Sequence, residues 1–169
     1  MPPNGPPWLF PFVEEPGGSQ ERPILRPAVA VSLSSVLDDE QTPKMLALVD
    51  SGANRVLAGP GLGRLAGVDP GSARTETIGI GGNHRSVYFG TVQIRLFAHA
   101  SSIDEPAVAE WEQEIGFLKE WEPPWGVVLG QQGFFDRFTV SMNRYAQALA
   151  VEPVERFDER FGYLYPTEE

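Results

Sequence analysis

Two short apolar runs, each followed by a glycine-containing turn, are the clearest feature of the hydrophobic pattern. Residues 46–49 lead into Asp50-Ser51-Gly52, and residues 127–129 lead into Gly130. Runs of branched apolar residues without alternation are typical of buried strands. A tight turn at Gly52 aims backbone amides at the preceding side chain. The pattern therefore predicts two buried strands, the first of which delivers a carboxylate into a turn.

Extended segments account for most of the remaining chain. Apolar residues alternate with polar ones through residues 24–36, which predicts a half-buried strand. The sequence Gly81-Gly82-Asn83 is a strong turn signal between two further extended runs. These runs, and those of a predicted closing hairpin, are residues 75–80, 84–97, 139–143 and 146–151. The chain is therefore predicted to be mainly β.

Residues 104–121 follow a different pattern. Their apolar side chains recur at helical steps, at Val108, Trp111, Ile115 and Leu118. Asp104 is placed to cap the amino end of such a helix. We expect one inserted amphipathic helix that covers part of the core, with a groove-lining or partner-binding role as the alternative.

The two ends of the chain differ in composition from the middle. Residues 1–22 are rich in proline, which excludes a regular helix or a central strand, yet they contain the aromatic segment Trp8–Phe12. Because three aromatic rings are unfavourable in a solvated tail, we expect this segment to dock on the core or on a partner chain. The predicted organisation is an arm at 1–22, a domain at 23–155 and an acidic tail at 156–169.

Composition restricts the classes of function. A length of 169 residues suits one domain, and a formal net charge of −10 disfavours binding to nucleic acid or to an anionic membrane surface. The absence of cysteine excludes disulfides and thiolate chemistry. No basic leader and no apolar run of membrane-spanning length is present, so we expect a cytoplasmic protein with no membrane partner.

The order and spacing of the motifs resemble those of single-domain, retropepsin-like aspartic peptidases. Asp50-Ser51-Gly52-Ala53 is followed by the glycine hairpin, then by Val127–Gly130 and by Phe134–Phe138. Bacterial members of this family are especially similar in the pattern Leu-Gly-x-x-Gly-Phe-Phe-Asp-Arg-Phe. The resemblance covers residues 24–152. It implies an all-β fold, with a closed β-barrel lobe, a flap hairpin and one short helix at 131–138, after the second glycine motif.

The same resemblance implies an aspartic endopeptidase. In this family two chains form a homodimer, and each contributes one catalytic carboxylate, here Asp50, to hydrolyse a protein or peptide substrate without a cofactor or a metal. Peptide hydrolysis by this route needs one carboxylate to accept a proton from water and another to donate one, and two carboxyls in contact share a proton in this way. Ser51 is expected to hold the loop by a hydrogen bond across the dyad, and the Gly52 amide to orient the carboxylate.

Further residues are assigned by position in the motif. Ile80, Gly81, Gly82 and Asn83 occupy the flap, where family members bind substrate, although an ordinary glycine hairpin is the alternative. Viral members carry an acid and an arginine at the positions of Asn54 and Gln131.

We expect these two amides to replace the charge pair that braces the active-site loop and the dimer. Arg55 and Arg137 are alternative braces.

Other functions find less support. Residues 59–67 superficially resemble a nucleotide loop but lack its Gly-Lys-Ser/Thr ending, and two isolated histidines do not predict a metal site. Two rivals of a different class remain. One is a catalytically silent lobe that binds peptides or acts as a scaffold, and the other is a structural dimerisation module in which Asp50 is unreactive.

Overall fold

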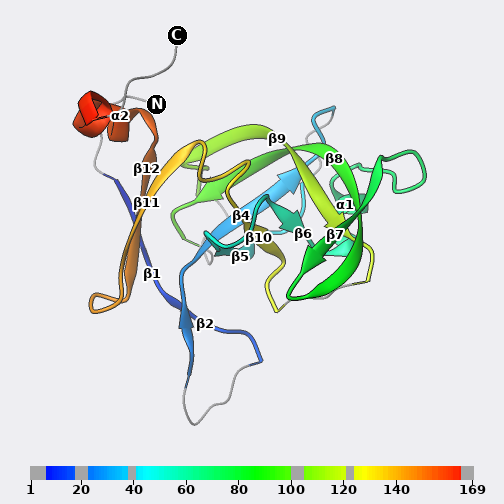
Figure 1. Ribbon diagram of the computed structural model, residues 1–169, viewed down its shortest axis with the longest axis horizontal. Coiled ribbons are helices and arrows are strands. Elements are labelled where there is room, and N and C mark those ends of the chain that lie inside the picture. Colours follow the sequence, from blue (N-terminus) through cyan, green and yellow to red (C-terminus); the bar gives the residue numbers. More distant parts are fainter. Residues whose placement is uncertain (1–6, 18–22, 38–40, 100–104, 121–123, 165–169) are drawn as a thin grey trace.

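The fold is all-β, as predicted. The computed structural model describes residues 7–17, 23–37, 41–99, 105–120 and 124–164 (Figure 1). Its strands are β1 (Trp8–Pro11), β2 (Val13–Glu14), β3 (Leu25–Arg26), β4 (Ala28–Ser34), β5 (Met45–Val49), β6 (Leu57–Ala58), β7 (Thr75–Ile80), β8 (Asn83–Phe97), β9 (Ala109–Leu118), β10 (Val127–Leu129), β11 (Phe138–Asn143) and β12 (Ala148–Pro153). Its helices are α1 (Pro60–Leu65), α2 (Glu155–Phe161) and the 3-10 turn η1 (Gly162–Leu164).

The main sheet closes on itself. Its strand order is β4-β5-β10-β6-β9-β8-β7, and β4 also pairs with β8. Six strands therefore form a closed ring, and β7 extends from β8 outside that ring. Large side chains from opposite sides of the ring, among them Leu33, Ile94, Ile115 and Leu129, are fully buried inside it. Since β4 is buried along its whole length, the prediction of a half-buried strand there is wrong.

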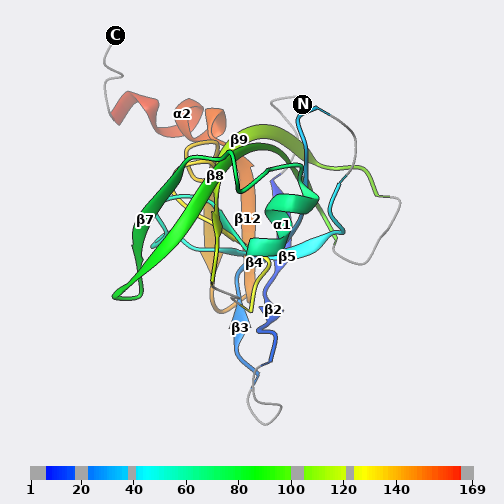
Figure 2. The ribbon, with the colours of Figure 1, turned by 90° about the vertical axis from the view of Figure 1, so that its right-hand side faces the viewer.

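The predicted glycine hairpin is confirmed. Strands β7 and β8 pair from Thr75 with Tyr88 to Ile80 with Asn83. The connecting residues Gly81 and Gly82 both have positive φ, +57° and +81°, which suits a two-residue hairpin turn that matches the twist of its strands. Figure 2 shows this hairpin extending beyond the closed sheet.

The aromatic segment of the amino-terminal arm docks on the core, as predicted. Strand β1 pairs with β12 and forms the edge of a second sheet, of order β1-β12-β11. The side chain of Phe10 is only 3% exposed, whereas that of its neighbour Leu9 is 70% exposed. Alternate residues of β1 thus face the core and the solvent.

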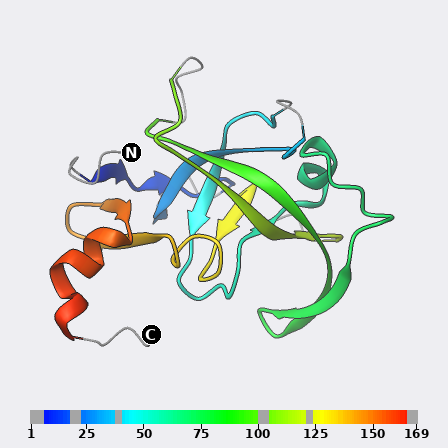
Figure 3. The same cartoon turned by 90° about the horizontal axis from the view of Figure 1, so that it is seen from above.

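The carboxy-terminal segment begins as a helix rather than as an extended tail. Helix α2 follows β12 directly, and Arg156 and Arg160 both form ion pairs with the buried carboxylate of Glu152. Figure 3 shows α2 beyond the second sheet, β1-β12-β11, on the side away from the β7–β8 hairpin.

The domain boundaries at 22/23 and 155/156 remain predictions. No helix in the described residues is long and apolar enough to cross a membrane.

The amphipathic helix expected at 104–121 is wrong. Residues 109–118 instead form β9, which pairs with β8 along its whole length. Glu110, Glu112 and Glu114 alternate with inward-facing residues, and this alternation was the signal for a strand. Trp111 and Ile115 fit both the helical and the strand pattern, and pairing with the long β8 decided between them. The expected cap, Asp104, lies outside the described residues.

The short helix expected at 131–138 is also wrong. Residues 131–137 form consecutive turns, in which Phe135 N donates to Gly130 O and Arg137 N donates to Phe134 O. Gly133 lies in this segment with a φ of +98°, a conformation that interrupts a right-handed helix. Its amide donates to the Asp136 carboxylate at 3.0 Å, which fixes the turn.

We predict that Phe10→Ala destabilises the protein by about 3 kcal/mol, because the substitution leaves a cavity beneath β1. Leu9→Ala, on the solvent face of the same strand, is expected to change the free energy of unfolding by less than about 0.5 kcal/mol. Denaturant unfolding of the full chain measures both values. Equal effects of the two substitutions would show that β1 is not docked in this register.

Candidate active site

Asp50 stands at the carboxy end of β5, where β5 pairs with β10. The two strands are parallel, with Leu48 beside Val128 and Val49 beside Leu129. The ladder continues one step further, since the amide of Asp50 donates to Leu129 O at 3.0 Å. The backbone at Asp50 is therefore fixed by the ladder between β5 and β10. Strand β10 is buried as predicted, whereas β5 is only half-buried, because Met45, Leu46 and Leu48 are partly exposed.

The turn itself holds the Asp50 side chain. The amide of Gly52 donates to Asp50 Oδ1 at 2.9 Å, which is the orienting role predicted for Gly52. The amide of Ala53 donates to Asp50 O at 3.1 Å. Asp50 is half-buried, and Ser51 and Gly52 are exposed. One carboxylate oxygen is thus held by the backbone at an open surface of the molecule.

The segment after Gly130 braces this loop. The amide of Gln131 donates to Ala53 O at 2.8 Å, and that of Gln132 donates to Asn54 O at 3.0 Å. Gly130 itself lies against the loop, since a Cβ there would come closer than 3.0 Å to the carbonyl oxygens of Ala53 and Arg55. The loop and the second glycine motif therefore form one packed unit.

The side chain of Gln131 contributes to the same brace. Its Nε2 donates to Ser51 O at 2.7 Å, so the amide reaches the loop through a backbone carbonyl. Asn54 lies in the same loop, with its side chain exposed. Of the alternative braces, Arg137 donates to Glu112 O at 3.4 Å, on β9. The sequence could not predict that Gln131 donates to the Ser51 carbonyl, because side-chain patterns do not reveal backbone partners.

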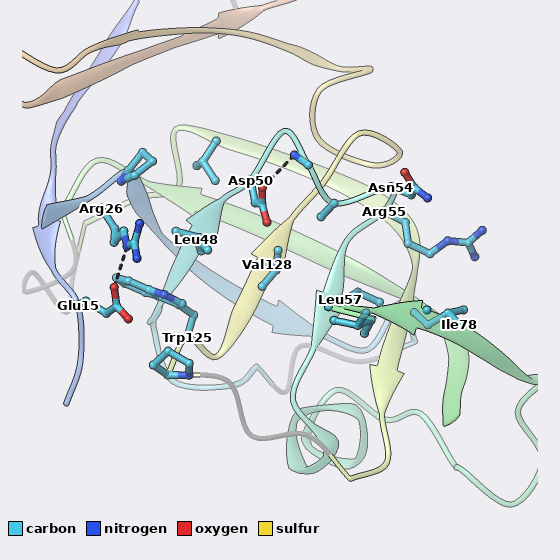
Figure 4. Close-up of a pocket in the computed structure, with 18 residues that line it drawn as sticks. Glu15, Arg26, Leu48, Asp50, Asn54, Arg55, Leu57, Ile78, Trp125 and Val128 are labelled. Carbon is cyan, nitrogen blue, oxygen red and sulfur yellow. Dashed lines mark hydrogen bonds and ion pairs between the residues drawn. The ribbon is translucent and has the colours of Figure 1, made fainter. Parts of the chain in front are cut away.

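Asp50 faces a cleft of about 800 Å³ (Figure 4). Its apolar lining comes from β5, β6, β7, β10 and the segment before β10. The lining side chains are those of Leu48, Leu57, Ile78, Ile80, Trp125 and Val128. Its charged lining comprises Asp50, Arg55, Glu15 and Arg26. The cleft is therefore largely apolar, with few charges at fixed places.

Two of the four residues assigned to the flap, Ile80 and Gly81, line the cleft, and their role there stays a prediction. Residues 78–81 line the cleft together with Asp50, so the hairpin and the loop face one space. Gly82 and Asn83 complete the hairpin turn but do not contribute to this lining. His84 follows on β8 and is exposed.

Three contributors to the cleft were missed. Arg26 lies on β3 and Glu15 directly follows β2, and the two form an ion pair at 2.7 Å. Trp125 is buried just before β10. The arm was expected to dock, but its pairing with residues 25–26 depends on a short antiparallel ladder for which the sequence gives no period. Trp125 lies next to two prolines and outside any periodic run.

A second Asp-x-Gly sequence shows what the site adds to a simple turn. At Asp69-Pro70-Gly71 the Gly71 amide donates to Asp69 Oδ1 at 2.9 Å, as in the Asp50 turn. This bond, with a further one from Ser72, holds the pKa of Asp69 below its usual value. Asp69, however, follows no strand and does not line the cleft. The local hydrogen bond is therefore shared, and the setting at the end of β5 is not.

We predict that Gly130→Ala destabilises the protein by about 1–3 kcal/mol, since the methyl group has to displace backbone rather than a flexible side chain. Gly61→Ala in α1 is the matched control, because a Cβ there meets nothing within 4 Å and alanine favours a helix. The control is expected to be neutral or slightly stabilising. Thermal and denaturant unfolding measure both variants, and a neutral Gly130→Ala would contradict the packing described.

Comparison with known proteins adds a likeness of structure. The sequence matches no protein-family model and no curated protein. In structure, the chain is similar to the crystal structure of a retropepsin-like aspartic protease from Rickettsia conorii, with 12% sequence identity, coverage of 84% of this chain and 97% of that chain, and a TM-score of 0.49.

Proposed function

We propose that the protein is an aspartic endopeptidase whose catalytic dyad consists of Asp50 from each of two chains. The observation that carries the proposal is the setting of Asp50. Its carboxylate is held by the Gly52 amide, at the end of the paired strands β5 and β10, and it faces a cleft that the β7–β8 hairpin also lines. The exposed turn at Asp69 shares the local hydrogen bond, but it follows no strand and does not line the cleft.

The chemistry requires a second carboxyl. One carboxylate accepts a proton from the attacking water, while a protonated carboxyl donates to the peptide carbonyl or to the leaving nitrogen. In the described part of the cleft, the other carboxylate belongs to Glu15, which is paired with Arg26 at 2.7 Å. A second copy of Asp50, brought close by a two-fold axis, supplies the missing group. Two such carboxyls share one proton, because both cannot ionise at contact distance.

The cleft supports an extended peptide as the substrate. Its apolar lining accommodates hydrophobic side chains, and the hairpin residues 78–81 present backbone groups to a bound strand. Closure of a hairpin over the peptide would exclude water from the reacting bond. Asn54 and Gln131 then act on the loop and on the dimer rather than on the substrate.

The alternative is a catalytically silent lobe that binds peptides or serves as a dimeric scaffold. The exposed Gln131 side chain in place of a charged brace favours this alternative. A silent lobe would keep the cleft and the hairpin but would not depend on the Asp50 carboxylate. Substitution of that carboxylate separates the two functions.

We predict that Asp50→Asn abolishes peptide cleavage and leaves the fold intact. Asparagine cannot accept the proton from water, yet its side-chain oxygen can still accept the Gly52 amide. Asp69→Asn is the matched control, because it makes the same change in the same type of turn outside the cleft. Cleavage of a peptide library and thermal unfolding are compared for the three proteins. Equal cleavage by wild type and Asp50→Asn would exclude the aspartic mechanism.

We predict that Asp50→Asn chains inhibit wild-type chains by forming mixed dimers with them. After free exchange at equal concentrations, about one quarter of the pairs are wild-type homodimers under random two-fold pairing, and only these retain full activity. Light scattering establishes the dimer, and the rate is measured before and after exchange. A rate that falls only in proportion to the wild-type concentration, from a monomeric protein, would overturn the shared dyad.

A further inference from the structure

The charges that line the cleft are not equally compensated. Arg26 is neutralised by Glu15 at 2.7 Å. Arg55 also lines the cleft, but its side chain forms no ion pair or hydrogen bond within the part of the chain that the structure describes. An uncompensated guanidinium beside an apolar surface is a potential site for a carboxylate.

Strand register gives the distance between Arg55 and Asp50. Leu48, Val128 and Leu57 lie side by side on β5, β10 and β6. Asp50 follows Leu48 by two residues, and Arg55 precedes Leu57 by two on a strand that runs the opposite way. Both residues therefore lie at the same end of the sheet and on the same face. Their backbones are two strand spacings apart, which is about 10 Å. Figure 4 shows Asp50 and Arg55 on this side of the three strands.

Arg55 is positioned by contacts that leave its charge available. Its guanidinium stacks over the Phe89 ring at 5.0 Å, and its backbone bridges to Gln132 beside the loop. A second arginine, Arg74, stacks on the same ring at 4.3 Å, but Arg74 forms ion pairs with Glu76 and Glu114. Of these two cations at Phe89, only Arg55 lines the cleft.

We propose that Arg55 is a specificity-determining residue that binds an acidic side chain of the substrate. This inference rests on the proposed peptidase function. A planar guanidinium donates two parallel hydrogen bonds to a carboxylate, and Arg55 has no internal carboxylate to displace. An extended peptide advances about 3.3 Å per residue, so 10 Å corresponds to about three residues. The structure thus assigns a preference for glutamate or aspartate about three residues from the scissile bond, next to apolar residues in the centre of the cleft.

The test compares peptides that differ only in glutamate, glutamine or lysine at one position. A library with apolar central residues carries the variable residue at each position up to four from the centre, and products are quantified by mass spectrometry at about pH 6, where glutamate is ionised. Wild type is expected to cleave the glutamate peptide about tenfold faster in kcat/KM than the glutamine peptide at one favoured position. Arg55→Gln is expected to remove this preference, and Arg55→Glu to transfer it to lysine.

Arg64→Gln is the matched control, since Arg64 is an exposed arginine on α1 that does not line the cleft. It is expected to retain the wild-type preference. Equal cleavage of all three peptides by wild type, or an Arg55→Glu variant with unchanged preference, would overturn the role of Arg55 while leaving the peptidase intact.

A binding experiment separates failure of this inference from failure of the proposed function. The same peptides are titrated onto the Asp50→Asn protein, with and without Arg55→Gln, by fluorescence anisotropy. Tighter binding of the glutamate peptide that depends on Arg55 would support the carboxylate site even if wild type cleaves nothing. Binding that is indifferent to both the charge of the peptide and Arg55 would exclude it.

Discussion

The parallel pairing of β5 with β10 is the constraint on which the site depends. It places the ends of β5 and β10 side by side, so that the Asp50 turn and the Gly130 turn pack against each other. Gly130 permits this contact because a side chain there would meet the carbonyl oxygens of Ala53 and Arg55. Once the two turns are joined, the Gly52 amide and the Gln131 side chain fix the rest of the loop.

The sequence was sufficient to predict those parts of the fold in which one local signal dominates. Unbroken apolar runs identified β5 and β10, and two adjacent glycines identified the β7–β8 turn, where both have positive φ. The prediction failed at residues 109–118, where alternating glutamates and helically spaced apolar residues compete. Pairing with the 15-residue strand β8 resolves that competition, and a long-range partner of this kind cannot be read from a local window.

The residues of the candidate site also fall into those that a local motif predicts and those that it does not. Asp50, its turn and the hairpin were found because each has a compact local motif. Three features were not found, because their parts meet only after the sheet has closed. They are the Glu15–Arg26 pair, Trp125 in the cleft, and the hydrogen bond from Gln131 to the Ser51 carbonyl. Arg55 was considered as a brace, but it lies two residues before Leu57 and lines the cleft.

The closed sheet also explains why one chain presents a single oriented carboxylate to the cleft. Each strand of the ring is hydrogen-bonded to a neighbour on both sides. Within the described residues, the other carboxylate in the cleft belongs to Glu15, which forms an ion pair with Arg26. The lobe therefore orients a single carboxylate firmly and leaves the space in front of it open. Under the proposed two-fold pairing, each chain contributes the same rigid unit, so two copies of the β5–β10 ladder determine the geometry of the dyad. Each copy also places one Arg55 on its own side of the cleft.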